Sequence, residues 1–237
     1  MKFLKRINAI SIDIETMNLD ADEISLESKF LKGHPNTKDA DKIKAQIQKK
    51  KEDLKIKGAV KDSCKISCIG LHMHGQAPVV IHTIGEQYNL LEDYGIESYF
   101  VASEQEMLEE FRAIMDNICD DETEIVVAGK YFDIPKLRLA AVRNGVKSPK
   151  SIIPMAGNRI YDVLYVGGKY FLVGNKRHND LGLDELCERL GVETGGKVIC
   201  GSEVPRMIED GECKEVVIYN ALDAVKNTEC YRKMTCQ

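Results

Sequence analysis

The chain opens on a segment, residues 7–14, in which isoleucines alternate with other residues. A two-residue alternation of this kind predicts a β-strand with one face turned to the core. The pattern then changes, because residues 20–61 are polar, rich in lysine and poor in aromatic side chains. Ile43 and Ile47 keep helical spacing within that stretch, so we interpret residues 20–61 as an insertion that is helical in its second half.

Beyond the insertion, the chain alternates between strand and helix patterns. Strand character returns three times, in residues 65–73, 78–84 and 124–128. Apolar residues at helical spacing occur four times, in residues 104–119, 134–144, 181–190 and about 214–233. The turn at residues 74–76 makes the first two of these strands a hairpin, and Ser103 is the expected N-cap of the helix that follows it. Strands first, and then helices interleaved with a strand, predict one α/β domain with a mixed sheet over residues 1–237.

Bulk composition excludes several classes of protein. The chain has 237 residues, of which 43% are hydrophobic and 30% charged, as in an ordinary globular domain. No uncharged apolar run reaches the length of about 18 residues that a membrane span needs. The charged N-terminus leads straight into a strand rather than into the apolar centre of a signal peptide, so we expect a cytoplasmic location. The eight cysteines include no C-x-x-C pair, which predicts reduced thiols, with no disulfide and no zinc site.

Charge is unevenly distributed along the chain. The net charge is −5, but residues 38–61 hold nine lysines against four acids, so that +5 lies in the insertion and −10 on the remainder. A local positive field of this kind can steer a polyanion, although a lysine-rich helix face is often only a solvated surface. Lys49, Lys50 and Lys51 are the candidate phosphate contacts.

A set of carboxylates carries the candidate chemistry. Asp13 and Glu15 stand two apart on the first strand, so alternation places both on one face. Two such groups are costly to bury unless a divalent cation with oxygen ligands neutralises them, whereas an isolated pair at a strand end is more commonly solvated. Asp133 stands at the junction between a predicted strand and the helix that follows it. Asp223 lies in the last predicted helix, one turn after Tyr219.

These residues carry a resemblance to a known family. Three segments, Asp13-Ile14-Glu15-Thr16, Phe132-Asp133 and Tyr219-Asn220-Ala221-Leu222-Asp223, resemble in order the exonuclease motifs of the DEDD superfamily. The tyrosine four residues before the last aspartate is similar to the DEDDy branch. The residues of these motifs look most like those of the proofreading domain of family B DNA polymerases and its stand-alone relatives, including those of phages. The resemblance covers about the whole chain except the insertion, with one departure: Ala128 stands where the family often has asparagine, so a contact to the substrate end is missing or supplied elsewhere.

The resemblance implies a fold and an activity. The fold is α/β, an RNase H-like mixed β-sheet flanked by helices, with the lysine-rich helical insertion after the first strand. The activity is metal-dependent 3′–5′ exonuclease hydrolysis of DNA, on a single strand, in DNA replication or repair. Nucleic acid is the expected partner, DNA in preference to RNA, together with a separate polymerase or replication protein. The expected setting is a bacterial or phage-infected host cytoplasm.

The resemblance also implies roles for individual residues. Two divalent cations, Mg²⁺ or in its place Mn²⁺, would be held by Asp13, Glu15, Asp133 and Asp223, with Asp13 shared between the two ions. Tyr219 would orient the attacking water. Thr16 and Phe132 are the expected substrate contacts beside the acids.

Two other functions stay open. One is a 3′–5′ exoribonuclease resembling RNase D, since the motifs share the chemistry. The other is a catalytically inactive nucleic-acid-binding module, against which the intact acids and tyrosine argue.

Several other polar residues have simpler interpretations. We expect Asp162 to be a buried structural aspartate rather than a fifth site acid. His72 and His74 are expected on one face of the hairpin and lack a nearby third metal ligand. His178 lies in a basic loop, where a phosphate contact and a solvated side chain are equally expected.

Overall fold

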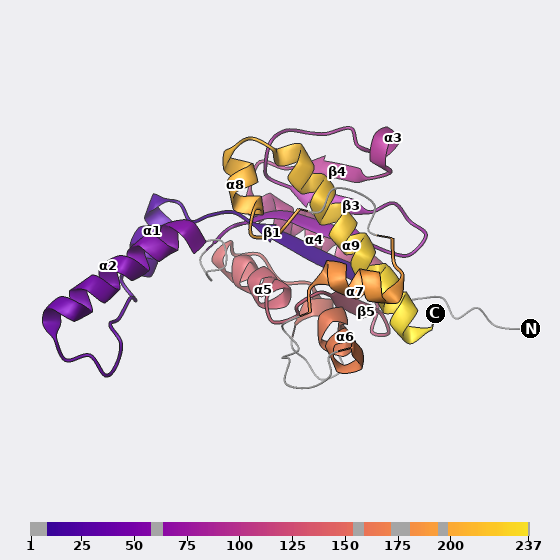
Figure 1. Ribbon diagram of the computed structural model, residues 1–237. Helices are drawn as coiled ribbons and strands as arrows, with labels where there is room; N and C mark the ends of the chain where they lie inside the picture. Colours follow the sequence, from indigo (N-terminus) through magenta and orange to yellow (C-terminus); the bar gives the residue numbers. More distant parts are fainter. Residues whose placement is uncertain (1–8, 58–63, 154–158, 172–180, 194–198, 237) are drawn as a thin grey trace, which may run out of the picture.

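The computed structural model describes residues 9–57, 64–153, 159–171, 181–193 and 199–236 (Figure 1). In chain order the elements are β1 (Ala9–Thr16), α1 (Ala21–Ser28), α2 (Ala40–Lys57), β2 (Ile66–His72), β3 (Val79–His82), α3 (Leu91–Tyr94), β4 (Glu97–Phe100), α4 (Glu104–Ile118), β5 (Glu124–Val127), α5 (Asp133–Arg143), the 3-10 helix η2 (Lys150–Ile152), β6 (Ile160–Asp162), α6 (Val163–Phe171), α7 (Leu183–Leu190), α8 (Val204–Glu209) and α9 (Cys213–Thr235). Among these helices, none has the combination of length and apolar character that crossing a membrane requires.

The strands form one six-stranded mixed sheet in the order β4-β3-β2-β1-β5-β6. The hairpin of β2 and β3 is antiparallel, and β1 pairs antiparallel with β2. The other pairs, β1 with β5, β3 with β4 and β5 with β6, are parallel. The first predicted strand therefore becomes an inner strand, with a neighbour on each side.

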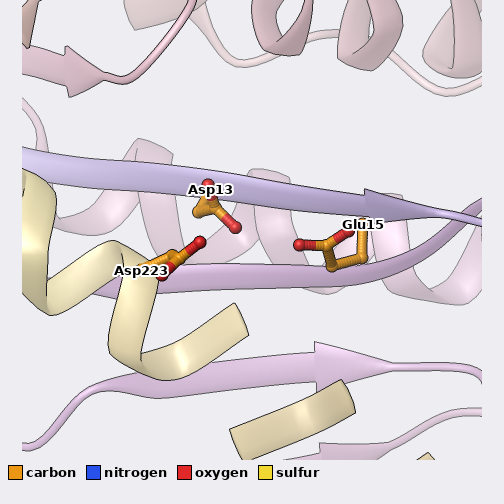
Figure 2. Close-up of side chains that lie close together, drawn as sticks. All are labelled: Asp13, Glu15 and Asp223. Carbon is orange, nitrogen blue, oxygen red and sulfur yellow. The ribbon is translucent and has the colours of Figure 1, made fainter. Parts of the chain in front are cut away.

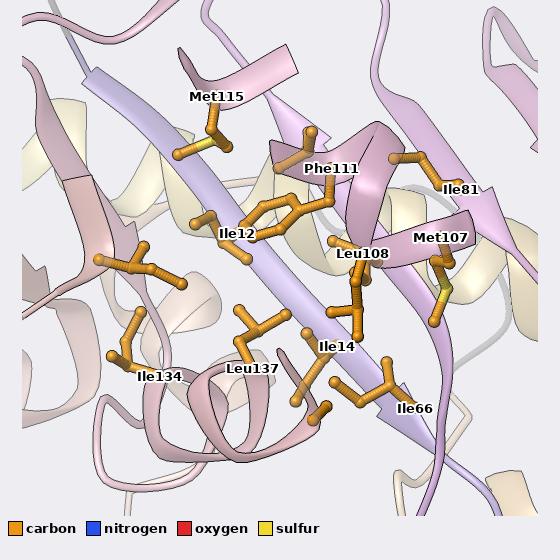
Figure 3. Close-up of a cluster of buried hydrophobic side chains, with 14 of the residues drawn as sticks. Ile12, Ile14, Ile66, Ile81, Met107, Leu108, Phe111, Met115, Ile134 and Leu137 are labelled. Atoms are coloured by element: carbon orange, nitrogen blue, oxygen red, sulfur yellow. The ribbon is translucent and has the colours of Figure 1, made fainter. Parts of the chain in front are cut away.

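The two faces of β1 meet different helices. Ile10, Ile12 and Ile14 belong to the largest buried cluster, together with side chains of α4 and α5 such as Phe111 and Leu137 (Figure 3). The alternate residues of β1 face α9: the Ser11 hydroxyl, for example, donates to the Ala224 carbonyl at 2.6 Å. The alternation seen in the sequence thus places Asp13 and Glu15 on the side of the sheet that α9 covers.

A glycine allows α9 to lie close to the sheet. Gly70 of β2 faces Asn220 of α9, and a Cβ atom at position 70 would lie 2.7 Å from the Asn220 side-chain oxygen and 2.8 Å from its carbonyl oxygen. Asn220 is fully buried at this crossing. The absence of a side chain at position 70 therefore allows this close approach of α9 to β2.

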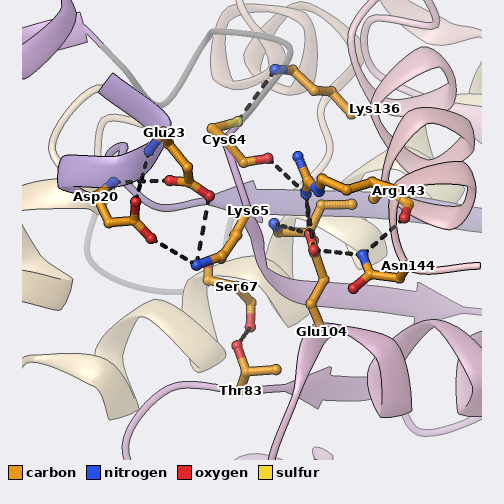
Figure 4. Close-up of polar contacts among 12 residues, drawn as sticks. Asp20, Glu23, Cys64, Lys65, Ser67, Thr83, Glu104, Lys136, Arg143 and Asn144 are labelled. Carbon is orange, nitrogen blue, oxygen red and sulfur yellow. Dashed lines mark hydrogen bonds and ion pairs between the residues drawn. The ribbon is translucent and has the colours of Figure 1, made fainter. Parts of the chain in front are cut away.

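The helices α1 and α2, residues 20–57, form an arm that projects from the body of the molecule (Figure 1). At its root the Met17 amide donates to the Lys65 carbonyl, and Leu54 packs with Leu19 and Cys64 in a small buried cluster. Polar contacts surround this root in Figure 4, where the Lys65 ammonium lies 2.9 Å from an Asp20 carboxylate oxygen.

The expected α/β class and mixed sheet are confirmed, and so are the hairpin, the four predicted helices and the lysine-rich helical insertion. Residues 7 and 8 of the first predicted strand lie outside the described residues. The first half of the insertion is also helical, because the side chains of Asp20 and Glu23 accept hydrogen bonds from each other's backbone N–H, at 2.9 and 2.8 Å, and cap α1. The short elements α3, β4, β6, α6 and α8 were not expected from the sequence.

Candidate active site

Three carboxylates from two distant parts of the chain meet on the α9 side of the sheet (Figure 2). Asp13 and Glu15 come from β1 and Asp223 from α9, and one oxygen of each lies within 4.8 Å of the others. Asp13 and Asp223 are only 9% and 7% exposed, so water screens their charges poorly. Such an arrangement suits a metal ion that prefers oxygen ligands, so these three side chains could hold one.

Asp133 lies beside this triad without being part of it. It is the first residue of α5 and is 4% exposed, and its Oδ2 atom has no hydrogen-bond partner. A buried carboxylate oxygen without a partner is costly, and a cation bound at that oxygen would remove the cost.

The acids share one pocket of about 540 Å³. The residues expected at the site that line it are Asp13, Glu15, Thr16, Phe132, Asp133, Tyr219 and Asp223. Ala128, where the resembling family often has asparagine, lines the same pocket. The structure therefore brings the acids, the tyrosine and two candidate substrate contacts into one space.

The arm lysines are not part of that space. Lys49, Lys50 and Lys51 lie exposed on α2, and the Lys50 ammonium donates to the Lys32 carbonyl at 2.5 Å within the arm. Any role they have in substrate binding is exerted away from the carboxylates.

Burial and mutual repulsion raise the pKa values of the acids. Desolvation is the largest cause for Asp13, whose pKa is raised further by Asp223, and for Glu15, whose pKa is raised further by Asp13. Desolvation and then the charge of Asp13 raise the pKa of Asp133 in the same way. Without a cation, the folded protein therefore holds its carboxylates in an environment that disfavours their charged form.

Lys226 is a contributor that the sequence reasoning missed. Its buried ammonium lies 2.8 Å from Asp223 and 2.8 Å from Asp184 at the start of α7. Burial lowers the pKa of Lys226, but its hydrogen bonds to Asp184 and Asp223 outweigh burial and raise that pKa overall. Lys226 follows Asp223 by three residues on one helix, a spacing that could have indicated the pair in advance.

Asn220 is a second contributor that was not singled out. Its Nδ2 donates to Asp13 Oδ2 at 2.7 Å across the contact between α9 and β1. This bond fixes one oxygen of Asp13, and it opposes the rise in the Asp13 pKa. Asn220 thereby orients Asp13 from the same helix that supplies Asp223.

Tyr219 stands one helical turn before Asp223 and hydrogen-bonds to it. Burial, followed by the charges of Asp223 and Glu15, raises the pKa of the Tyr219 phenol. The group is therefore a neutral phenol that donates or accepts hydrogen bonds, and it cannot serve as an anionic base at neutral pH.

The residues with simpler interpretations lie outside the acidic group. Asp162 is buried and accepts hydrogen bonds from four backbone N–H groups, which is the structural role expected of it. His72 Nδ1 lies 2.9 Å from Thr228 Oγ1, and His74 pairs with Glu229. His178 falls in a segment outside the described residues.

Comparison with known proteins gives a fold and no family assignment. No family model matches the sequence, and no curated protein matches it. Among solved structures, the chain is similar to the family B DNA polymerase from the hyperthermophilic archaeon Pyrobaculum calidifontis, with a TM-score of 0.54 and 16% sequence identity. The match covers 96% of this chain and 24% of that chain, so this chain spans about a quarter of the polymerase's length. The likeness supports the RNase H-like mixed sheet flanked by helices.

Proposed function

We propose that this chain is a metal-dependent 3′–5′ exonuclease of the DEDDy type that hydrolyses single-stranded DNA from its 3′ end. The observation that carries the proposal is the meeting of Asp13, Glu15 and Asp223 within 4.8 Å in a pocket that also holds Asp133. We further propose that residues 1–237 make up one exonuclease domain.

The residues present fit a pair of divalent cations. All four side chains offer carboxylate oxygens, the ligands that Mg²⁺ prefers and that Mn²⁺ also accepts. The unpartnered Oδ2 of Asp133 and the closely spaced carboxylates of Asp13 and Glu15 are groups that a bound cation would neutralise. When bound, such ions lower the pKa of a coordinated water and neutralise charge on a phosphodiester.

Other groups at or beside the pocket orient water and the acids and form the pocket wall. Tyr219, a neutral phenol, can hold a water by a hydrogen bond next to Asp223. Lys226 holds Asp223 in place and opposes the rise that burial causes in the Asp223 pKa. Thr16 and Phe132 line the wall of the pocket and are proposed to contact the terminal nucleotide.

The size of the pocket supports a single-stranded end as substrate. A pocket of about 540 Å³ is in the range that encloses a small ligand, so it suits one nucleotide unit and not a duplex. The likeness in fold to a DNA polymerase supports DNA over RNA, and a separate polymerase or replication protein as partner. The free cysteines fit a reducing compartment such as the cytoplasm.

The arm is proposed to contact phosphates through Lys49, Lys50 and Lys51. Neutralising the three to glutamine should weaken binding of single-stranded DNA and make its salt dependence shallower, with turnover at saturation little changed. The salt range of about 50 to 200 mM is where phosphate contacts change affinity measurably. If the variant binds single-stranded DNA as tightly as the original protein throughout that range, these lysines are only a solvated helix face.

Degradation of 5′-labelled substrates tests the proposal against its alternatives. Single-stranded DNA, duplex DNA and RNA are compared at equal concentration with Mg²⁺, Mn²⁺ or EDTA. The proposal requires metal-dependent shortening that is fastest on single-stranded DNA. Faster shortening of RNA would favour the exoribonuclease, and binding with no hydrolysis under any of these conditions would favour the inactive module.

A further inference from the structure

A second hollow adjoins the acidic pocket, and its surface chemistry differs. It measures about 320 Å³ and is lined in part by the rings of Tyr131 and Tyr165. It shares Phe132 and Leu164 with the acidic pocket. The two spaces are therefore neighbours with a common wall.

The two tyrosines of this hollow are unusually exposed for large side chains. Tyr131 is 78% exposed and Tyr165 is 36% exposed, so neither contributes much to the core. Single exposed aromatics are ordinary on a protein surface. Here Tyr131 lies in the turn after β5 and Tyr165 lies in α6. Although they are 34 positions apart in the chain, both tyrosines line the same hollow.

Two lysines accompany the rings. The Lys130 ammonium lies 5.1 Å from the ring centroid of Tyr131 and 5.1 Å from that of Tyr165. The Lys169 ammonium lies 4.2 Å from the Tyr165 centroid, one helical turn further along α6. Positive charge is thus concentrated next to the carboxylate pocket of a chain whose net charge is −5.

A buried carboxylate fixes the two segments that carry this cluster. Asp162 accepts hydrogen bonds from Gly129 N–H and Lys130 N–H, at 3.3 and 3.0 Å, on the turn after β5. It also accepts from Leu164 N–H and Tyr165 N–H, at 3.1 and 3.0 Å, at the start of α6. The backbone segments that carry the two rings are therefore held relative to each other, which lowers the entropy lost when a ligand binds.

We infer that Tyr131, Tyr165, Lys130 and Lys169 form a platform for the nucleotides that precede the 3′ end in the acidic pocket. On binding, the two ammonium groups turn from the rings to the phosphates, and bases take their place against the two rings. Stacking of this kind tolerates any base, because every base has an aromatic face. It requires an unpaired strand, since the faces of duplex bases are covered by their neighbours. This inference rests on the proposed function, and it adds the surface that selects a single strand.

Binding in EDTA, where no hydrolysis occurs, tests the platform separately from catalysis. Fluorescence anisotropy of a labelled single-stranded oligonucleotide is measured with the full chain. Tyr131→Ala and Tyr165→Ala should each weaken binding about 5- to 150-fold, the range for loss of one stacked base. Tyr131→Phe and Tyr165→Phe keep the ring and should bind within about twofold of the original protein.

Tyr94 provides a matched control. It is 54% exposed and has the Lys214 ammonium 5.8 Å from its ring centroid, but it lines neither hollow. Tyr94→Ala should leave binding unchanged. Weakening by Tyr94→Ala equal to that by Tyr131→Ala would overturn the platform, because any exposed tyrosine would then have the same effect.

Hydrolysis with Mg²⁺ separates the two proposals. The platform predicts that Tyr165→Ala raises KM for a long oligonucleotide more than for a dinucleotide, which offers only one preceding base to the rings. If the protein degrades DNA but the alanine variants bind and cleave as the original does, the platform is wrong and the proposed function stands. If nothing is hydrolysed but Tyr131→Ala and Tyr165→Ala still weaken binding, the platform stands and the nuclease proposal fails.

Discussion

The Asp13→Asn substitution should change the thermal stability of the protein in opposite directions with and without metal. In the metal-free protein, Asp13 lies within 4.8 Å of two other carboxylates. Two unit charges at that separation repel by about 3 kcal/mol at an effective dielectric constant of about 20. Lys226 and proton uptake offset part of this repulsion, which leaves a relief of about 1–2 kcal/mol when the charge is removed. The Asn220 bond is retained, because an asparagine oxygen also accepts it.

For a chain of this length, 1 kcal/mol corresponds to about 2–4 °C in Tm, so the metal-free variant should melt about 2–8 °C above the original protein. Mn²⁺ should reverse the order of the two Tm values. At a hundred times its Kd, each bound ion stabilises the folded state by about 2.7 kcal/mol, or roughly 5–10 °C. The original protein should gain this stability and Asp13→Asn should not.

The assay is thermal unfolding by circular dichroism, in EDTA and in a Mn²⁺ series. Asp116→Asn is the matched control, since Asp116 is a surface acid on α4 that pairs with Arg112 at 3.2 Å. Its Tm should follow that of the original protein in both conditions. A lower Tm for Asp13→Asn in EDTA, combined with an undiminished rise in Mn²⁺, would show that Asp13 is not a repelled metal ligand.

Three further predictions concern the site and the fold that supports it. Tyr219→Phe should retain measurable turnover in a DNA degradation assay where Asp223→Ala retains none; equal and complete loss would mean that the phenol is a structural support. Gly70→Ala should cost about 1–3 kcal/mol in urea unfolding and also reduce activity, because its Cβ would lie 2.7 Å from the Asn220 oxygen and displace α9; unchanged stability would contradict the close approach. Burial lowers the pKa of His82, so the unfolded state takes up its proton first, and stability present above about pH 6.5 is lost as pH falls toward the folded pKa. Urea unfolding of His82→Gln between pH 7 and pH 5 should show a shallower loss, and an identical slope would show that His82 does not contribute.

Much of the fold could be predicted because its signals are local. The helix α4 begins where Ser103 was expected to cap it, and the Ser103 hydroxyl does accept from the Glu106 N–H, at 3.2 Å. The strands β4 and β6 could not be predicted in this way. They have four and three residues, and their place is set by parallel pairing with β3 and β5, which no short-range pattern encodes. The helix α1 did carry a signal, the reciprocal caps of Asp20 and Glu23.

The residues of the candidate site also divide into those that a local sequence pattern predicts and those that it does not. Alternation along β1 was enough to place Asp13 and Glu15 on one face. No spacing rule connects these residues to Asp223, about 210 positions away, so the expectation that they meet came from the resemblance to the exonuclease motifs. The spacing of Lys226 and Asp223 on one helix is a local signal for their contact, whereas the tyrosines of the adjoining hollow are brought together by tertiary packing, and the structure was needed to find them.

Hydrolysis from the 3′ end is tested by the product pattern of a single-stranded oligonucleotide labelled separately at each end. With Mg²⁺, the 3′ label should be released at once as a mononucleotide, while the 5′ label moves down a ladder one nucleotide at a time. Both patterns should disappear in EDTA and in the Asp13→Asn variant. Release of internal fragments, release of the 5′ label first, or full activity of Asp13→Asn would contradict a 3′–5′ exonuclease built on these carboxylates.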